Sequence, residues 1–269
     1  KNLAVAIGLQ RRHEQAYIDT IRRLQDGAIG DINTMRAYWN SGGVWTRPRK
    51  PEWSEMEYQM RNWYYFNWLC GDHICEQHIH NMDVCNWLKN DYPAVAQGMG
   101  GRQVRTGKDH GEIFDHHFVE FTYADGRKMF SQCRHIEDCW SSVSEAAHGA
   151  AGWAQIDAGK IYDRADKVTW SYGRGGRGGH QQEHHDLFAA LRAGKIPNEG
   201  EYGAMSTMTA ILGRMATYSG KEIKMKDALA SELVIAPADD FHTFADTPPV
   251  EPNADGRYPV PMPGRTLTV

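Results

Sequence analysis

The chain has no apolar run near the ~18 residues that a membrane-spanning helix needs. It also has no block of basic residues, and its formal net charge is −4, so the sequence gives no reason to expect a nucleic-acid partner. Its five cysteines include no Cys-x-x-Cys pair, which argues against a disulfide framework. We therefore expect a soluble globular protein with no nucleic-acid or membrane partner and with reduced or buried thiols.

Aromatic residues, in contrast, are abundant: the 269 residues include nine Trp and twelve Tyr. Five of the tryptophans crowd into one region, namely Trp39, Trp45, Trp53, Trp63 and Trp68. Flat aromatic faces suit the apolar C–H faces of sugar rings. Packing of these side chains in a core or a subunit interface is an equally good interpretation.

The most informative segment runs from Gly71 to Trp87. If this segment is a helix, with about 100° per residue, five of its side chains share one face. They are His73, Glu76, His80, Asp83 and Trp87. The apolar residues of the segment fall roughly opposite, where a core would lie. Two imidazoles and two carboxylates on one face predict either proton-transfer chemistry or metal ligation.

The rest of the chain predicts strands that cluster between helices. Short apolar or alternating runs predict strands at residues 3–8, 33–39, 94–99, 114–123, 128–134, 141–147, 154–157 and 168–172. Helices are predicted at residues 14–25, 59–68, 182–193 and 201–218. The Pro-rich tail from Pro237 onward looks irregular. This order is typical of an α+β domain, with a mostly antiparallel sheet and helices on one face.

Two familiar motifs are better explained by local structure. Gly173–Gly178 matches the dinucleotide fingerprint G-x-G-x-x-G. The strand before it alternates polar and apolar residues and no βαβ unit follows, so we expect a surface loop. His180–His184 matches the zinc motif H-x-x-E-H, but no obvious third ligand follows, and we expect a polar helix start. His116 and His117 are neighbours on a strand, so their side chains should point to opposite faces.

Four segments are informative in combination. The first consists of residues 5–13 together with residues 26–31, and the second is the helix that carries Glu76, His80 and Asp83. The third and fourth are residues 183–187 and residues 209–214. Together they resemble the Gfo/Idh/MocA oxidoreductases, the family of glucose–fructose oxidoreductase and inositol dehydrogenase. The helix resembles that family's D-x-x-x-H-x-x-D motif, with Glu76 in place of the usual first Asp. The resemblance spans nearly all of the chain.

The resemblance implies the family's C-terminal domain, whose large, mostly antiparallel sheet is like that of the C-terminal domain of glyceraldehyde-3-phosphate dehydrogenase. It assigns residues 1–12 to the last strand of a dinucleotide-binding domain that is otherwise absent from the chain. Residues 13–236 would be the substrate-binding and oligomerisation domain, and residues 237–269 a Pro-rich tail. The cofactor implied for the complete protein is NAD or NADP, so this chain alone is expected neither to bind it nor to oxidise sugars.

By the same resemblance, His80 is the general acid/base. It would remove the proton of a sugar, polyol or glycoside hydroxyl while hydride leaves the same carbon for NAD(P)+, and an imidazole with a pKa near 6.5 suits that transfer. Glu76 would hydrogen-bond the substrate or tune the imidazole, and Asp83 would accept a hydrogen bond from its second ring nitrogen. The substrate-binding wall is expected from Arg11, Arg12, Trp39, Glu183 and His184. No metal is expected in this site.

Two alternatives stay open. His73, Glu76 and His80 have the helical spacing of a zinc face, which Glu183 or His184 could complete in a metal-dependent hydrolase or lyase. A domain of this kind could instead bind carbohydrate, or form homo-oligomers through its sheet, without catalysing a reaction. The sequence predicts neither the particular sugar nor the cellular compartment. It also does not separate a dehydrogenase from an enzyme that cleaves glycosides through transient oxidation.

Overall fold

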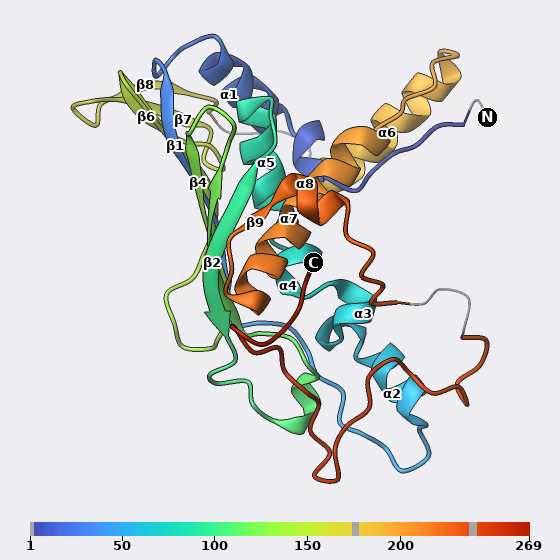
Figure 1. Cartoon of the computed structure of the whole chain (residues 1–269). Helices are drawn as coiled ribbons and strands as arrows, with labels where there is room; N and C mark the ends of the chain where they lie inside the picture. Colours follow the sequence, from blue (N-terminus) through green and yellow to red (C-terminus); the bar gives the residue numbers. More distant parts are fainter. Residues whose placement is uncertain (1–2, 174–177, 237–240) are drawn as a thin grey trace.

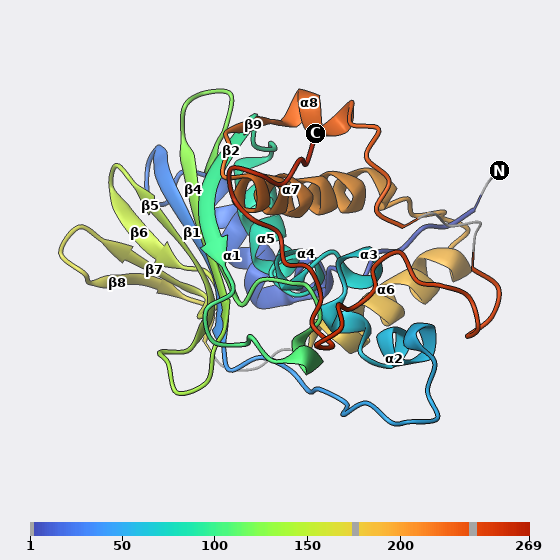
Figure 2. The same ribbon diagram turned by 60° about the horizontal axis from the view of Figure 1, so that its bottom comes forward.

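A nine-stranded sheet forms the centre of the molecule (Figures 1 and 2). The computed structural model describes residues 3–173, 178–236 and 241–269. Within these residues the strands lie in the order β8-β7-β6-β5-β1-β4-β3-β2-β9. They are β1 Ile32–Ser41, β2 Val95–Gly101, β3 His116–Thr122, β4 Lys128–His135, β5 Ser142–Gly149, β6 Gly152–Gln155, β7 Lys160–Asp163, β8 Val168–Ser171 and β9 Ile223–Lys224. Neighbouring strands are antiparallel except β1 and β4, which are parallel.

The helices lie on one side of this sheet (Figure 2). The α-helices are α1 Gln15–Gln25, α2 Glu55–Arg61, α3 Asn67–Cys70, α4 His73–Glu76, α5 Ile79–Lys89, α6 Gly179–Arg192, α7 Gly200–Ser219 and α8 Met225–Leu229. Three short 3₁₀ helices are η1 Gln10–His13, η2 Trp63–Tyr65 and η3 Lys108–His110. The main core lies between the sheet and α1, α5 and α7, where Ile21, Met82 and Leu212 are fully buried. The expected α+β fold is confirmed.

Strand β4 shows how the sequence specifies the sheet. Met129, Ser131, Cys133 and His135 are buried, and the residues between them are half-buried. This period-2 alternation is the pattern of a strand that packs one face on a core. The turn before β4 contains Gly126 at φ +83°, a conformation that glycine adopts without steric cost. Strands β3 and β4 therefore form an antiparallel hairpin.

Two predicted elements are wrong. Residues 3–8 do not form a buried strand: Leu3 is 67% exposed, and the segment pairs through a single bridge between Val5 and Asn198. Its assignment to a dinucleotide-binding domain stays a prediction, and Lys1 and Asn2 lie outside the described residues. The predicted helix at residues 59–68 is broken into the end of α2, then η2 and α3, because Phe66 adopts an extended conformation between η2 and α3.

The helix predicted from Gly71 to Trp87 is also not continuous. It splits into α4 and α5 at Gln77 and His78, and Asp72 precedes α4 with φ +73°. The break turns the buried His78 side chain toward β4, where its Nε2 atom lies 2.7 Å from the Ser131 Oγ. The two halves of the motif therefore need not share one face.

The aromatic residues build a second core. Tyr58, Tyr64, Tyr65 and Phe66 are buried together, and Tyr258 from the C-terminal tail completes the cluster. Trp53 and Trp68 pack against this cluster and are half-buried, so the interpretation as core packing holds for much of the aromatic region. The tail has neither helix nor strand from residue 241 to 269, in agreement with the expected irregular segment. Residues 237–240 lie outside the described part of the chain.

The far side of the sheet carries exposed aromatic side chains. Phe118 stacks on Phe130, and Tyr38 meets Trp140 edge to face with ring centroids 6.0 Å apart. Self-association through this face stays a prediction. Among the described residues, no helix is long and apolar enough to cross a membrane.

Candidate functional site

His80 lies where three elements of the fold meet. It is the second residue of α5, is half-buried, and faces Trp39 of β1 with ring centroids 6.3 Å apart. The Arg11 guanidinium of η1 sits over the same Trp39 ring, 5.9 Å from its centroid. The structure thus brings together three residues that the sequence predicts for the site: His80, Arg11 and Trp39.

The His80 imidazole is held in its neutral form. Burial, together with the positive charges of Arg11 and His180, lowers the pKa of His80 to about 4. Its Nδ1 atom is shielded from solvent and has no hydrogen-bond partner among the described residues. A neutral imidazole is the form that accepts a proton in general base catalysis.

Arg11 is fixed by a buried network that the sequence did not reveal. Its Nη1 atom donates to Glu145 Oε1 at 2.8 Å, and Asn81 Nδ2 donates to the same oxygen at 2.6 Å. The Tyr17 hydroxyl donates to Glu145 Oε2 at 3.1 Å. Burial raises the pKa of Glu145 to about 7, and Arg11 opposes that shift. In the sequence, the available signal is Glu145, a charged residue followed by two alanines in a predicted strand. That pattern does not identify Arg11 as the partner of Glu145.

Asp83 contacts Arg12 and not His80. Arg12 donates to both carboxylate oxygens at 2.8 Å, and the Ser206 hydroxyl adds a third hydrogen bond at 2.7 Å. The Arg12 guanidinium also packs over the Tyr202 ring, 4.1 Å from its centroid. Because these donors occupy Asp83, the expected hydrogen bond to the second ring nitrogen of His80 is not formed. Arg12 likewise has its guanidinium committed to Asp83.

The alternative zinc face of His73, Glu76 and His80 is not formed among the described residues. His73 is fully buried beside Asp72 and His117. Within the described residues, Asp72, His73 and His117 form the one group of three acid, His or Cys side chains with ligand atoms close enough to share a metal ion. Glu76 is the last residue of α4. Its Oε2 atom is shielded from solvent and has no hydrogen-bond partner among the described residues, and burial raises the pKa of the Glu76 carboxyl.

Glu183 and His184 lie on helix α6. Glu183 Oε2 is shielded from solvent and has no described hydrogen-bond partner. His184 is exposed, and its Nδ1 atom lies 2.8 Å from the His180 carbonyl oxygen. The His180–His184 motif therefore does not form a metal site among the described residues. The adjacent G-x-G-x-x-G match includes residues 174–177, which lie outside the described part of the chain.

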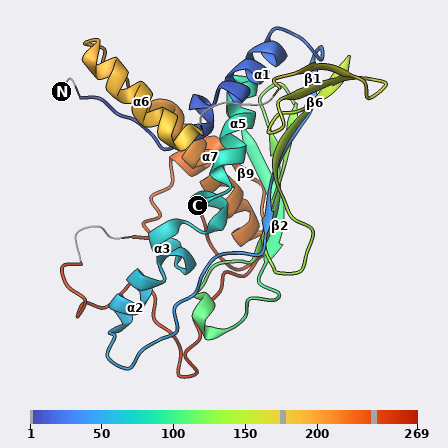
Figure 3. The same cartoon turned by 180° about the vertical axis from the view of Figure 1, so that it is seen from behind.

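Helix α6 packs on η1 through a close backbone approach. The helix runs beside the N-terminal segment and projects away from the sheet (Figures 1 and 3). A Cβ atom at Gly179 would lie 2.3 Å from the Gln10 carbonyl oxygen, whereas one at Gly178 would meet nothing within 4 Å. The His13 Nδ1 atom also lies 2.7 Å from Asp186 Oδ2. Gly179 thus allows α6 to reach the site.

Replacing Gly179 by alanine should loosen this contact. We expect Gly179→Ala to lower the free energy of unfolding by about 1–3 kcal/mol, the usual cost of overpacking. Gly178→Ala is the matched control, because its φ of −62° suits alanine and its Cβ has room, and it should change stability by less than about 1 kcal/mol. Urea denaturation of both variants measures the difference. Equal effects would mean that α6 does not depend on this approach.

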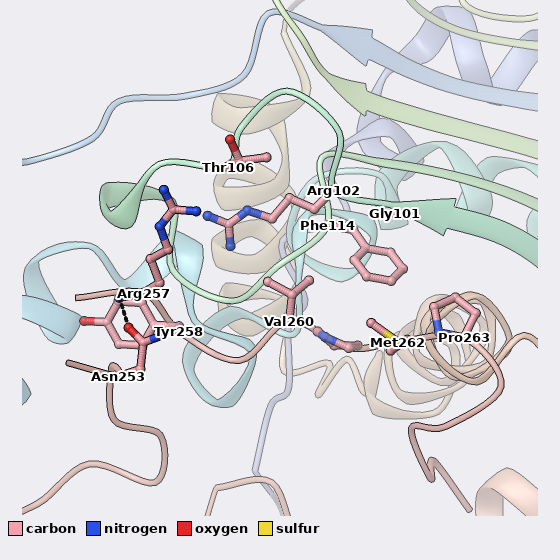
Figure 4. A pocket seen from close by; sticks show the side chains of 11 residues that line it. Gly101, Arg102, Thr106, Phe114, Asn253, Arg257, Tyr258, Val260, Met262 and Pro263 are labelled. Carbon is pink, nitrogen blue, oxygen red and sulfur yellow. Dashed lines mark hydrogen bonds between the residues drawn. The ribbon is translucent and has the colours of Figure 1, made fainter. Parts of the chain in front are cut away.

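A cavity of about 520 Å³ lies elsewhere, where the end of β2 meets the C-terminal tail (Figure 4). It is lined by Arg102, Phe114, Arg257, Tyr258 and Met262, among others. The Arg102 guanidinium donates to three backbone carbonyls at 2.5–2.8 Å, so its charge is committed to the loop around it. None of the residues expected in the site lines this cavity, which is separate from the surroundings of His80.

No family model and no curated protein matches the chain. Solved structures match it in fold. The aldose–aldose oxidoreductase of Caulobacter crescentus, complexed with glycerol, is 15% identical, with a TM-score of 0.62 over 82% of this chain and 64% of that chain. Levoglucosan dehydrogenase, in complex with NADH and levoglucosan, is 13% identical, with a TM-score of 0.63 over 84% and 67%. An oxidoreductase from Thermotoga maritima is 15% identical, with a TM-score of 0.61 over 83% and 63%.

These neighbours are Gfo/Idh/MocA-type oxidoreductases, so the resemblance in the sequence is confirmed at the level of the fold. The α+β sheet matches the C-terminal domain of that type. The chain spans less than two thirds of the length of the Caulobacter and Thermotoga chains. At identities of 13–15%, this similarity shows the fold and not the substrate or the reaction.

Proposed function

We propose that this chain is the substrate domain of an NAD(P)-dependent oxidoreductase that acts on a hydroxyl of a sugar, polyol or glycoside. His80 carries the proposal: it is a neutral imidazole with an unpartnered ring nitrogen, beside an aromatic face and a fixed guanidinium. The shared fold adds support, because two structural neighbours are named for reactions on aldose and levoglucosan.

In this proposal His80 accepts the proton of the substrate hydroxyl and returns it in the reverse direction. Trp39 offers an apolar ring face to the C–H face of the sugar, and Arg11 donates hydrogen bonds to a neighbouring hydroxyl. Glu145 keeps Arg11 in place through the 2.8 Å ion pair. Asp83 is then a positioning residue, because it acts through Arg12 and not on His80.

The position of the glycine-rich segment in the sheet does not support a dinucleotide site there. The strand before the glycine-rich segment, β8, is antiparallel to β7 and lies at the edge of the sheet, whereas the dinucleotide fingerprint follows a strand of a parallel βαβ unit. We therefore assign the nicotinamide cofactor, which would supply the hydride acceptor, to a separate domain of the complete protein. Levoglucosan dehydrogenase, a structural neighbour, was solved with NADH.

The test is a substrate screen on the complete protein. NAD+ and NADP+ are supplied with aldoses, cyclic polyols, anhydrosugars and glycosides, and formation of the reduced cofactor is followed by its absorbance. We expect at least one carbohydrate to give reduced cofactor at a rate that saturates with its concentration. The 269-residue chain assayed alone is the control, and it should give no reduced cofactor.

The rival without catalysis predicts a different result. A carbohydrate-binding or assembly module would bind sugars, as measured by calorimetry, yet reduce neither cofactor with any compound of the panel. That combination would contradict the proposed reaction while leaving the fold assignment unchanged.

A further inference from the structure

A second cluster of chemically active side chains lies inside the molecule, apart from His80. Asp72 and His73 come from the start of α4, and His117 comes from β3. All three are buried, with exposed fractions of 0%, 0% and 3%. One ligand atom of each lies within 4.8 Å of the others. The proposed reaction at His80 does not explain why these three polar side chains meet in the core.

The contacts centre on the Asp72 carboxylate. Asp72 Oδ1 lies 2.7 Å from His73 Nδ1, and Asp72 Oδ2 lies 3.2 Å from His117 Nε2. Ligands that bind Zn²⁺ at about 2.0–2.1 Å in a tetrahedron are about 3.3 Å apart. The 3.2 Å contact is close to that spacing, the 2.7 Å contact is shorter, and all three ligand atoms lie within 4.8 Å of one another.

His73 Nδ1 and His117 Nε2 lie close to the Asp72 carboxylate, yet neither makes a hydrogen bond of good geometry to it. Both ring nitrogens of His73 and the Nε2 atom of His117 are shielded from solvent and lack a partner of good geometry among the described residues. His135 stacks on His73 with ring centroids 4.2 Å apart, and its Nδ1 atom is unpartnered as well. Buried polar atoms without partners are rare because each costs about 1–3 kcal/mol. A bound cation would satisfy the lone pairs.

The outer contacts hold these groups as the second shell of a metal site would. His117 Nδ1 lies 2.9 Å from the Thr217 hydroxyl, which fixes the ring and directs Nε2 toward Asp72. Asp72 Oδ2 accepts from the Tyr218 hydroxyl at 2.6 Å and from the Phe114 backbone N–H at 3.1 Å. Hydrogen bonds of this kind to ligating His and carboxylate groups orient the ligands of natural metal sites.

The backbone at Asp72 adds a further sign of constraint. Asp72 has φ +73° and ψ 160°, a conformation that costs a non-glycine residue about 1–3 kcal/mol and persists where the surrounding structure requires it. In this conformation its carboxylate caps α4 and also faces His117. This strained backbone conformation places the Asp72 carboxylate between the two imidazoles.

We propose that Asp72, His73 and His117 bind one Zn²⁺ ion inside the domain. Two imidazoles and a carboxylate are a ligand set that zinc accepts readily, and a water would complete the tetrahedron. Because all three ligands are buried, the ion stabilises the fold where α4 packs against β3. This site includes neither Glu76 nor His80, so the proposal does not depend on the proposed function.

The strand itself supplies a matched control for the test. His116 and His117 are adjacent on β3 and point to opposite faces: His117 is buried, whereas the His116 side chain is 37% exposed. The complete protein and its variants His117→Gln and His116→Gln are stripped with a chelator under partly denaturing conditions. They are then refolded with or without ZnCl₂ and dialysed. Metal content is measured by mass spectrometry and the melting temperature by calorimetry.

We expect about one zinc per chain in the wild type and in His116→Gln, and less than a tenth of that in His117→Gln. Zinc should raise the melting temperature of the first two proteins by at least about 3 °C, the shift expected from a ligand well above its Kd, and leave that of His117→Gln unchanged. Zinc retained by His117→Gln would overturn the assignment. A wild type without zinc and without a shift would mean that Asp72 and the histidines form only a buried hydrogen-bonded cluster.

If His117→Gln does not fold, X-ray absorption at the zinc edge of the wild-type protein decides the question. The proposal requires nitrogen and oxygen ligands at about 2.0–2.1 Å with the outer scattering of imidazole rings. A sulfur shell at about 2.3 Å would place the ion on cysteines and contradict the proposal.

Discussion

Replacing His80 by alanine in the complete protein is expected to lower kcat at least ~100-fold, the scale of a lost general acid/base. The reason is the state of the side chain: His80 is neutral, faces Trp39, and has a shielded nitrogen without a described partner. Initial rates with a saturating substrate from the carbohydrate screen measure the loss. The affinity for the nicotinamide cofactor should change little, because the proposed cofactor site lies outside this domain.

His116→Ala is the control for this variant. His116 is a half-buried histidine on β3 that pairs with Asp115 at 2.7 Å, so its removal should leave kcat within about twofold. Added imidazole should restore part of the activity of His80→Ala by supplying the missing base. A loss under threefold in His80→Ala would mean that the base is another residue.

The pH profile gives an independent check on the same residue. Because burial lowers the pKa of His80 to about 4, the imidazole stays in its neutral, proton-accepting form from pH 8 down to about pH 5. The rate of substrate oxidation should therefore not decline near pH 6.5, where an ordinary histidine becomes protonated. It should fall only below about pH 5. An acid limb with a pKa near 6.5 would mean that His80 is more solvated in the complete protein than it is here.

The sheet could be predicted from the sequence where the pattern is local. The period-2 burial of β4 and the turn at Gly126 are both encoded in adjacent residues. Strand β7 is not predicted by its own sequence, because its four residues, Lys160–Asp163, carry only one fully buried apolar side chain. Pairing with β6 and β8 stabilises it, and no pattern in these four residues reveals that pairing.

The site could be predicted in part for the same reason. Arg11, Trp39 and His80 come together as the family resemblance implied. His73 leaves the predicted face because of partners far along the chain: it meets His117, 44 residues on, in a pocket that also depends on the positive φ of Asp72. A helical-wheel projection of residues 71–87 assumes one continuous helix, so it shows neither the break at Gln77 nor these long-range partners.

Removing Arg12 tests the other half of the predicted motif. Asp83 is 1% exposed, and Arg12 supplies two of its three hydrogen bonds. Arg12→Ala therefore leaves a buried carboxylate with the Ser206 hydroxyl alone. We expect the free energy of unfolding to fall by about 3–5 kcal/mol, the usual cost of breaking a buried ion pair. Denaturant unfolding with an unchanged m-value measures the loss.

The exposed pair Arg22–Asp19 on α1 provides the matched control, because the Arg22 side chain is 65% exposed. Arg22→Ala should cost less than about 1 kcal/mol. A lysine variant separates charge from packing. In Arg12→Lys a positive charge is kept but the two-pronged contact with Asp83 and the packing on Tyr202 are lost. Arg12→Lys should therefore lose less stability than Arg12→Ala. A loss of the same size in both variants would mean that the Arg12 side chain stabilises the protein by its packing and geometry and not through its charge.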